Sequence, residues 1–142
     1  MNFNNLDQLY RSVIMDHYKN PRNKGVIEDG TMTVDMNNPT CGDRIRLTFD
    51  IVDGIIKDAK FEGEGCSISM SSASMMTEAI KGHSLKEAMQ MSQEFTKMML
   101  GEDYEITEDM GDIEALQGVS QFPARIKCAT LAWNCLLYTS DA

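Results

Sequence analysis

Three cysteines and one aspartate, spread over three segments of the chain, have the side chains of a metal site. One cysteine and the aspartate stand on either side of a single glycine, and the other two cysteines each follow a turn that contains glycine or proline. Three thiols and one carboxylate suit a thiophilic ion, and zinc takes four ligands of these types at tetrahedral corners. The sequence therefore predicts a zinc site formed by Cys41, Asp43, Cys66 and Cys128.

The spacing of these residues favours metal binding. Cys41 and Asp43 are two residues apart, so both side chains lie on one side of an extended or loop segment, and Gly42 lets the backbone approach an ion. Cys66 and Cys128 lie near the starts of helical patterns. Unpaired N–H groups at a helix start lower the pKa of a thiol, and the thiolate is the form that binds metal or attacks sulfur.

The predicted site has an excess of negative charge. Three thiolates and a carboxylate around Zn²⁺ leave about two negative charges without compensation. Arg125 and Lys127 stand close before Cys128, and we expect both to offset this charge from just outside the ligand shell. The alternative is that they are solvated charges at a helix start.

The fourth cysteine and the histidines have other expected roles. Cys135 follows Cys128 by seven residues, a rise of about 10 Å on a helix, so one ion cannot join both and a place in the core is expected. A cysteine hydrolase needs a histidine base beside its thiol, and the contexts of His17 and His83 propose none. His17 is expected to have a structural role.

Composition limits the possible partners. The chain of 142 residues carries 22 acidic and 13 basic residues, a net charge of -9. Such a balance disfavours nucleic acid and anionic membrane, which attract clustered Lys and Arg. The N-terminal residues lack the pattern of a signal peptide, so we expect a cytoplasmic protein with reduced thiols. No repeat or linker divides the chain, and residues 1–142 are expected to form one domain.

Alternating apolar residues predict an antiparallel sheet. Positions 32–36 alternate, and positions 44–51 alternate strictly. Asp53-Gly54 is a hairpin signal, followed by a return strand that ends at Gly63, with a bulge expected near Ile55-Ile56. The predicted fold class is α+β, a small three-stranded antiparallel sheet with helices packed on one face.

Helical periodicity predicts the remaining elements. A first helix is expected over 6–19, a helix rich in small residues over 67–81 with Gly82 as its cap, and a third from the capping box at Ser84 to Gly101. The acidic stretch 102–112 is expected to be a solvated, mobile connection with a short turn near 113–116. The last helical pattern covers 126–134, after which the apolar spacing is lost.

Three blocks of sequence resemble the signatures of a known family. They are Asn38-Pro39-Thr40-Cys41-Gly42-Asp43, the segment from Gly63 to Ser69, and Ile126-Lys127-Cys128-Ala129-Thr130-Leu131-Ala132-Trp133. In this order they are similar to the NifU N-terminal, IscU and SufU family of iron–sulfur cluster assembly proteins. The resemblance implies the predicted fold and places the ligands at one end of the sheet.

The resemblance also implies a branch and a function. IscU scaffolds carry His directly before the last cysteine and a Leu-Pro-Pro-Val-Lys segment, whereas this chain has Lys127 and the segment 122–126. Its acidic stretch from about Gly101 to Gly118 resembles the insertion of the SufU branch. SufU-like proteins are zinc-dependent sulfur acceptors, in which Cys41 would take persulfide sulfur from a SufS-like pyridoxal-phosphate cysteine desulfurase after a partner residue replaces it on zinc.

The family also allows a second function. The alternative is an iron–sulfur scaffold that assembles a [2Fe-2S] cluster on Cys41, Cys66 and Cys128 and passes it to apo-proteins. In the sulfur-acceptor case the sulfur would go on to a downstream scaffold or to apo iron–sulfur proteins. In either case the protein is expected to be an acceptor partner of the desulfurase rather than a stand-alone enzyme.

Overall fold

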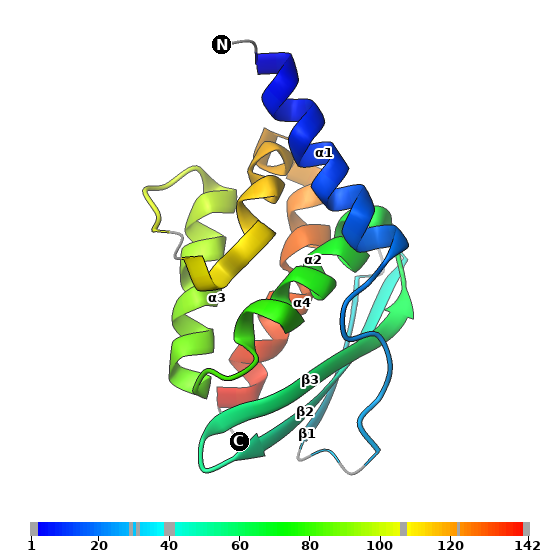
Figure 1. The fold of residues 1–142 in the computed structure, drawn as a ribbon, viewed down its shortest axis with the longest axis vertical. Coiled ribbons are helices and arrows are strands. Elements are labelled where there is room, and N and C mark those ends of the chain that lie inside the picture. Colours follow the sequence, from blue (N-terminus) through cyan, green and yellow to red (C-terminus); the bar gives the residue numbers. More distant parts are fainter. Residues whose placement is uncertain are drawn as a thin grey trace.

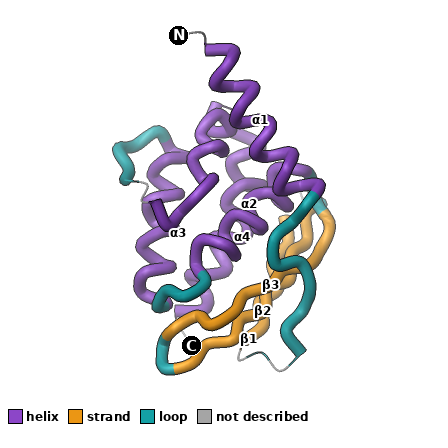
Figure 2. The backbone as a smooth tube through the Cα atoms, in the orientation of Figure 1, coloured by secondary structure: helices purple, strands orange, loops and turns teal. Residues whose placement is uncertain are grey.

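A three-stranded antiparallel sheet with helices packed on one face forms the protein in a computed structural model (Figures 1 and 2). The structure describes residues 3–28, 30, 32–38, 42–105, 108–121 and 123–140. The strands are β1 (Met32–Asn38), β2 (Asp43–Val52) and β3 (Ile55–Glu64), in the order β1-β2-β3. The predicted fold class is therefore confirmed.

Strand β2 is the middle strand, and its two faces differ as the alternation predicts. Ile45, Leu47 and Phe49 are buried under the helices, whereas Arg44 and Arg46 are exposed on the opposite face. This alternation fixes the register, because a shift by one residue would expose every apolar side chain of the strand.

The hairpin between β2 and β3 has the predicted turn. Asp53 and Gly54 both have positive φ angles, 52° and 78°, as a type I′ turn requires. The pairing shifts where Asp50 faces Asp58 and Ile51 faces Ile56. The bulge is thus confirmed, with Lys57 as the extra residue of β3.

The segment that follows the first helix covers the β3 edge of the sheet. The Phe61 N–H donates to the Asn23 carbonyl at 3.0 Å, and the Gly25 N–H donates to the Phe61 carbonyl at 2.7 Å. Figure 2 shows this loop running beside β3. Its hydrogen bonds satisfy backbone groups that an open edge would offer to another chain.

The helices are α1 (Phe3–Lys19), α2 (Ser67–Ile80), α3 (Leu85–Leu100), the 3-10 helix η1 (Glu108–Gln121) and α4 (Pro123–Ser140). Helix α2 is central, since it contacts α1, α4, η1 and β3, and eleven of its fourteen residues are buried. Serine and alanine on this helix let its neighbours approach closely. No helix within the described ranges combines the length and the apolar character needed to cross a membrane.

The two predicted boundaries of α3 are confirmed, and the predicted end of α2 is wrong by a residue. Helices α1 and α4 each begin three residues before their predicted starts at 6 and 126. Ser84 caps α3 with the full capping box, and Gly101 ends that helix with φ 77°. Helix α2, in contrast, ends at Ile80, because its C-cap Lys81 is extended and Gly82 lies one residue further on.

The acidic stretch differs from its prediction. Instead of one short turn near 113–116, residues 108–121 form η1, which packs against α1 and α2. Where burial is described, four apolar side chains of η1 are buried, and they are Ile113, Ala115, Leu116 and Val119. Acidic residues stand between these apolar positions, and for that reason the sequence predicts a solvated connection instead of a packed helix. Helix α4 also continues to Ser140, beyond the predicted pattern.

His17 joins three helices inside the core. It is 3% exposed, with Nδ1 2.8 Å from the Ser74 hydroxyl and Nε2 2.9 Å from Asp112 Oδ2. Because a carboxylate only accepts, Nε2 donates to Asp112, and the Ser74 hydroxyl is the hydrogen-bond partner of Nδ1. The contacts tie α1 to α2 and η1, as a structural role requires.

Replacing His17 with Ala should therefore lower the free energy of unfolding by roughly 2 to 3 kcal/mol, because two hydrogen bonds are lost and a cavity is left. Urea unfolding of the metal-free protein measures this loss. His83→Ala is the control, since its partner Glu87 is exposed and a loss below about 1 kcal/mol is expected. Equal losses in both variants would contradict the role given to His17.

Candidate metal centre

Three of the four predicted ligands meet at one end of the sheet. Asp43 is the first residue of β2, Cys66 is the N-cap of α2, and Cys128 lies in α4. One ligand atom of each lies within 4.8 Å of the others. Ligand atoms around a tetrahedral zinc ion are about 3.5 to 4 Å apart, so these three atoms would need to move only slightly closer together to bind one ion. Cys41 lies outside the described residues.

The Asp43 carboxylate is held in a fixed orientation. Although Asp43 is fully buried, Oδ1 accepts the Cys66 N–H at 3.0 Å and Oδ2 accepts the Ser69 hydroxyl at 2.6 Å. A buried carboxylate without such donors would carry a large desolvation cost. The two hydrogen bonds therefore keep the charged group beside the thiols.

Two glycines before Cys66 make room for this arrangement. A Cβ on Gly65 would lie 2.6 Å from Asp43 Oδ1. Gly63 has φ 144°, and a Cβ there would clash with the Arg44 carbonyl oxygen. The glycines thus let the end of β3 pass close to β2 and leave space for the carboxylate.

The environment of Cys66 favours its thiolate. Burial raises the pKa of the Cys66 thiol, and the Asp43 charge adds to this effect. The hydrogen bond from the Ser69 backbone N–H, together with the contacts of the Ser69 hydroxyl and of the Cys128 side chain, outweighs both effects, so the pKa of Cys66 lies below its ordinary value. A lowered thiol pKa reduces the competition between protons and a metal ion.

Cys128 differs from its predicted setting. It is the sixth residue of α4, beyond the first turn, so its N–H is not among the unpaired groups at the helix start. It is fully buried. The expectation of a helix-start thiol holds for Cys66 and is wrong for Cys128.

Arg125 and Lys127 are both exposed. In the described part of the chain, neither side chain forms a hydrogen bond or ion pair with Asp43, Cys66 or Cys128. Their predicted compensation of the site charge would act through space, and it stays a prediction.

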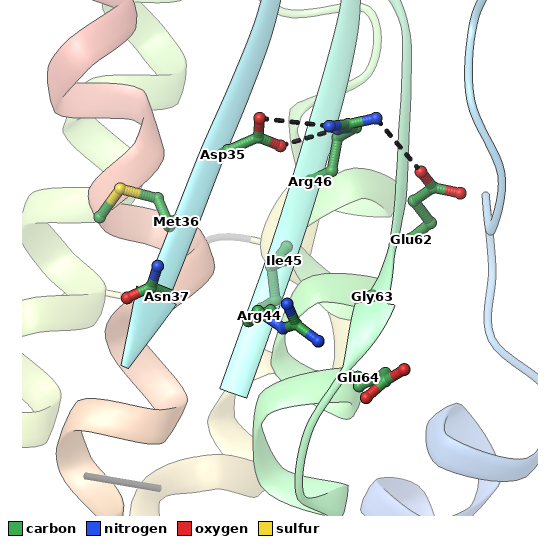
Figure 3. Close-up of a pocket in the computed structure, with 9 residues that line it drawn as sticks. All are labelled: Asp35, Met36, Asn37, Arg44, Ile45, Arg46, Glu62, Gly63 and Glu64. Atoms are coloured by element: carbon green, nitrogen blue, oxygen red, sulfur yellow. Dashed lines mark hydrogen bonds and ion pairs between the residues drawn. The ribbon is translucent and has the colours of Figure 1, made fainter. Parts of the chain in front are cut away.

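The outer face of the sheet carries a separate cavity of about 550 Å³ beside the strand ends. Figure 3 shows Arg46 between Asp35 and Glu62, with Arg44 and Glu64 nearer the strand ends. The Arg46 Nε lies 2.8 Å from Asp35 Oδ1. The cavity is lined mainly by charged residues and by none of the predicted ligands, so it is not the metal centre.

Sequence comparison places this centre in a known family. The family profile described as "NifU-like N terminal domain" matches residues 9–129. The chain belongs to the NifU-like N-terminal domain family. The resemblance drawn from the three sequence blocks is thereby confirmed.

Relatives support the SufU branch of this NifU-like family. A Bacillus subtilis protein named "Zinc-dependent sulfurtransferase SufU" is 69% identical, over 96% of this chain and 92% of its own. A Streptococcus pyogenes protein named as the iron-sulfur cluster assembly scaffold IscU is 45% identical, over 96% of this chain and 85% of its own.

A solved structure is also similar to this chain, in fold and in sequence. It is the proposed iron-sulfur cluster assembly scaffold for the SUF system of Fervidobacterium islandicum AW-1, 36% identical, with a TM-score of 0.84. The match covers 89% of this chain and 92% of that protein.

Sequence reasoning missed two residues of this NifU-like centre. Gly65 was read only as part of a turn, and Ser69 only as a small packing residue. The Gly-Glu-Gly run before Cys66 could have indicated a close approach. No signal in a serine-rich helix distinguishes the hydroxyl that reaches Asp43.

Gly65→Ala should displace the Asp43 carboxylate and weaken zinc binding by about tenfold or more, since partners that orient a ligand typically contribute 10–100-fold. Competition with a chromophoric chelator measures the dissociation constant. Gly118→Ala is the matched control, because a Cβ there meets no atom within 4 Å. If the two variants bind zinc equally well, Gly65 does not serve the site.

Proposed function

We propose that this protein acts in iron–sulfur cluster assembly as a zinc-dependent sulfur acceptor, taking persulfide sulfur from a cysteine desulfurase on Cys41. One observation carries the proposal: Asp43, Cys66 and Cys128, from three separate elements, converge within 4.8 Å. The Bacillus subtilis relative, similar over nearly the whole chain, bears the name of a zinc-dependent sulfurtransferase.

The donor set suits zinc. Two sulfur atoms and one carboxylate oxygen, with the Cys41 thiol as the fourth ligand, match the ligand types of tetrahedral zinc. When bound, the ion would keep the thiols deprotonated without taking part in redox chemistry. Asp43, Cys66 and Cys128 would hold it while Cys41 reacts.

The transfer is a thiol–disulfide exchange. The Cys41 thiolate attacks the outer sulfur of the desulfurase persulfide, a new S–S bond forms on Cys41, and the S–S bond of the donor breaks. The donor cysteine leaves as a thiolate, so charge and electrons balance and no external oxidant is needed. The product is a persulfide on Cys41, ready for a downstream scaffold or an apo iron–sulfur protein.

The partner would be a pyridoxal-phosphate cysteine desulfurase of the SufS type. A hollow of about 250 Å³ reaches Gly65, next to Cys66, between Tyr18 and Met70. It leaves this flank of the centre open to an approaching chain. The net charge of -9 suits a partner with a basic surface.

A scaffold function is the second candidate. The Streptococcus pyogenes relative, 45% identical, is named as an iron–sulfur cluster assembly scaffold. Cys41, Cys66 and Cys128 would then hold a [2Fe-2S] cluster. The two functions differ in the bound metal, because a scaffold needs iron and sulfide where the sulfur acceptor needs zinc.

The test combines metal analysis with desulfurase turnover. We expect one equivalent of zinc in the purified protein and stimulated turnover of a SufS-type desulfurase. Cys41→Ser should reduce turnover to that of the desulfurase alone, because the attacking thiolate is gone.

Cys135→Ser is the control and should retain the stimulation. Bound iron and sulfide, with turnover independent of zinc, would reverse the order of the two functions. Equal stimulation by Cys41→Ser and the unchanged protein would exclude Cys41 as the acceptor.

A further inference from the structure

The Ser69 hydroxyl touches all three described ligand residues. It lies 2.6 Å from Asp43 Oδ2, 3.2 Å from the Cys128 carbonyl oxygen and 3.6 Å from Cys66 Sγ. Ser69 is fully buried in the first turn of α2. A single side chain thus joins β2, α2 and α4 where the ligands meet.

The hydroxyl has one proton and several acceptors around it. A distance of 2.6 Å is typical of a hydroxyl that donates to an ionised carboxylate, which is a stronger acceptor than a carbonyl group. The Ser69 O–H therefore donates its hydrogen bond to Asp43 rather than to the Cys128 carbonyl oxygen.

Neighbouring serines on the same helix behave differently. Ser71 and Ser72 are equally buried, but their hydroxyls donate to the backbone carbonyls of Ile14 and Ala129. Ser74 contacts His17. Of the four buried serines of α2, Ser69 is the one whose hydroxyl contacts the predicted ligands, so helix packing alone does not explain it.

We propose that Ser69 is a positioning residue that orients the metal ligands of this centre before the ion arrives. The inference rests on the proposed metal function and adds a residue to it. Donation from Ser69 to Oδ2 and from the Cys66 N–H to Oδ1 prevents the carboxylate from rotating away.

The test compares Ser69→Ala with Ser71→Ala. Each removes one buried hydroxyl from α2, and Ser71 lies outside the centre, with its hydroxyl 2.7 Å from the Ile14 carbonyl oxygen. Zinc affinity is measured by competition with a chelator. We expect Ser69→Ala to bind zinc about 10–100-fold more weakly, the usual effect of removing a partner that orients a ligand. Ser71→Ala should stay within about threefold of the unchanged protein.

Two further readouts separate positioning from folding. The cobalt-substituted protein should show altered d–d bands in Ser69→Ala only, because the geometry around the metal changes. The zinc-induced rise in Tm, referenced to each variant without metal, should shrink in Ser69→Ala even if its fold is weakened. Ser69→Thr keeps the hydroxyl and should recover most of the affinity.

The outcomes distinguish a failure of the role proposed for Ser69 from a failure of the proposed zinc-dependent function. Unchanged zinc affinity and an unchanged cobalt spectrum in Ser69→Ala would overturn the positioning role and leave the zinc site intact. Failure of the unchanged protein to bind zinc in the same titration would overturn the proposed function, and the role of Ser69 with it.

Discussion

The hydrogen bond from the Cys66 N–H to the Asp43 carboxylate is the contact on which the centre depends. It joins the first residue of β2 to the N-cap of α2. The same carboxylate thus caps a helix and serves as a candidate metal ligand. Because Asp43 is fully buried, any movement of the helix start away from the strand would leave an unpaired charge in the interior.

The rest of the fold meets this requirement through small residues. Glycine at position 65 leaves space for the carboxylate, and glycine at 63 lets β3 run close to β2. Serines and alanines let α2 lie close to α4, which brings Cys128 to the other two ligands. Trp133 then fixes α4, because its ring stacks on Phe95 and its Nε1–H donates to Ser72 at 3.1 Å. The centre is therefore built from rigid elements, as a preorganised site requires.

The sequence predicted those parts of the fold in which a residue pattern favours a single local structure. Strict alternation predicted β2, the Asp53-Gly54 pair predicted the turn, and Ser84 predicted the start of α3. The donor types of Asp43, Cys66 and Cys128 predicted a metal centre, although their approach needed the tertiary fold. η1 was missed because its buried residues are sparse among acids, and Ser69 because its role depends on Asp43, 26 residues away.

The central claim is that Cys41, Asp43, Cys66 and Cys128 form one mixed sulfur and oxygen site. Zinc-edge X-ray absorption of the zinc-loaded protein tests it most directly. The account predicts about three Zn–S distances near 2.3 Å and one Zn–O distance near 2.0 Å, with one sulfur lost in Cys41→Ser. A first shell of nitrogen and oxygen alone, or an unchanged sulfur count in Cys41→Ser, would contradict it.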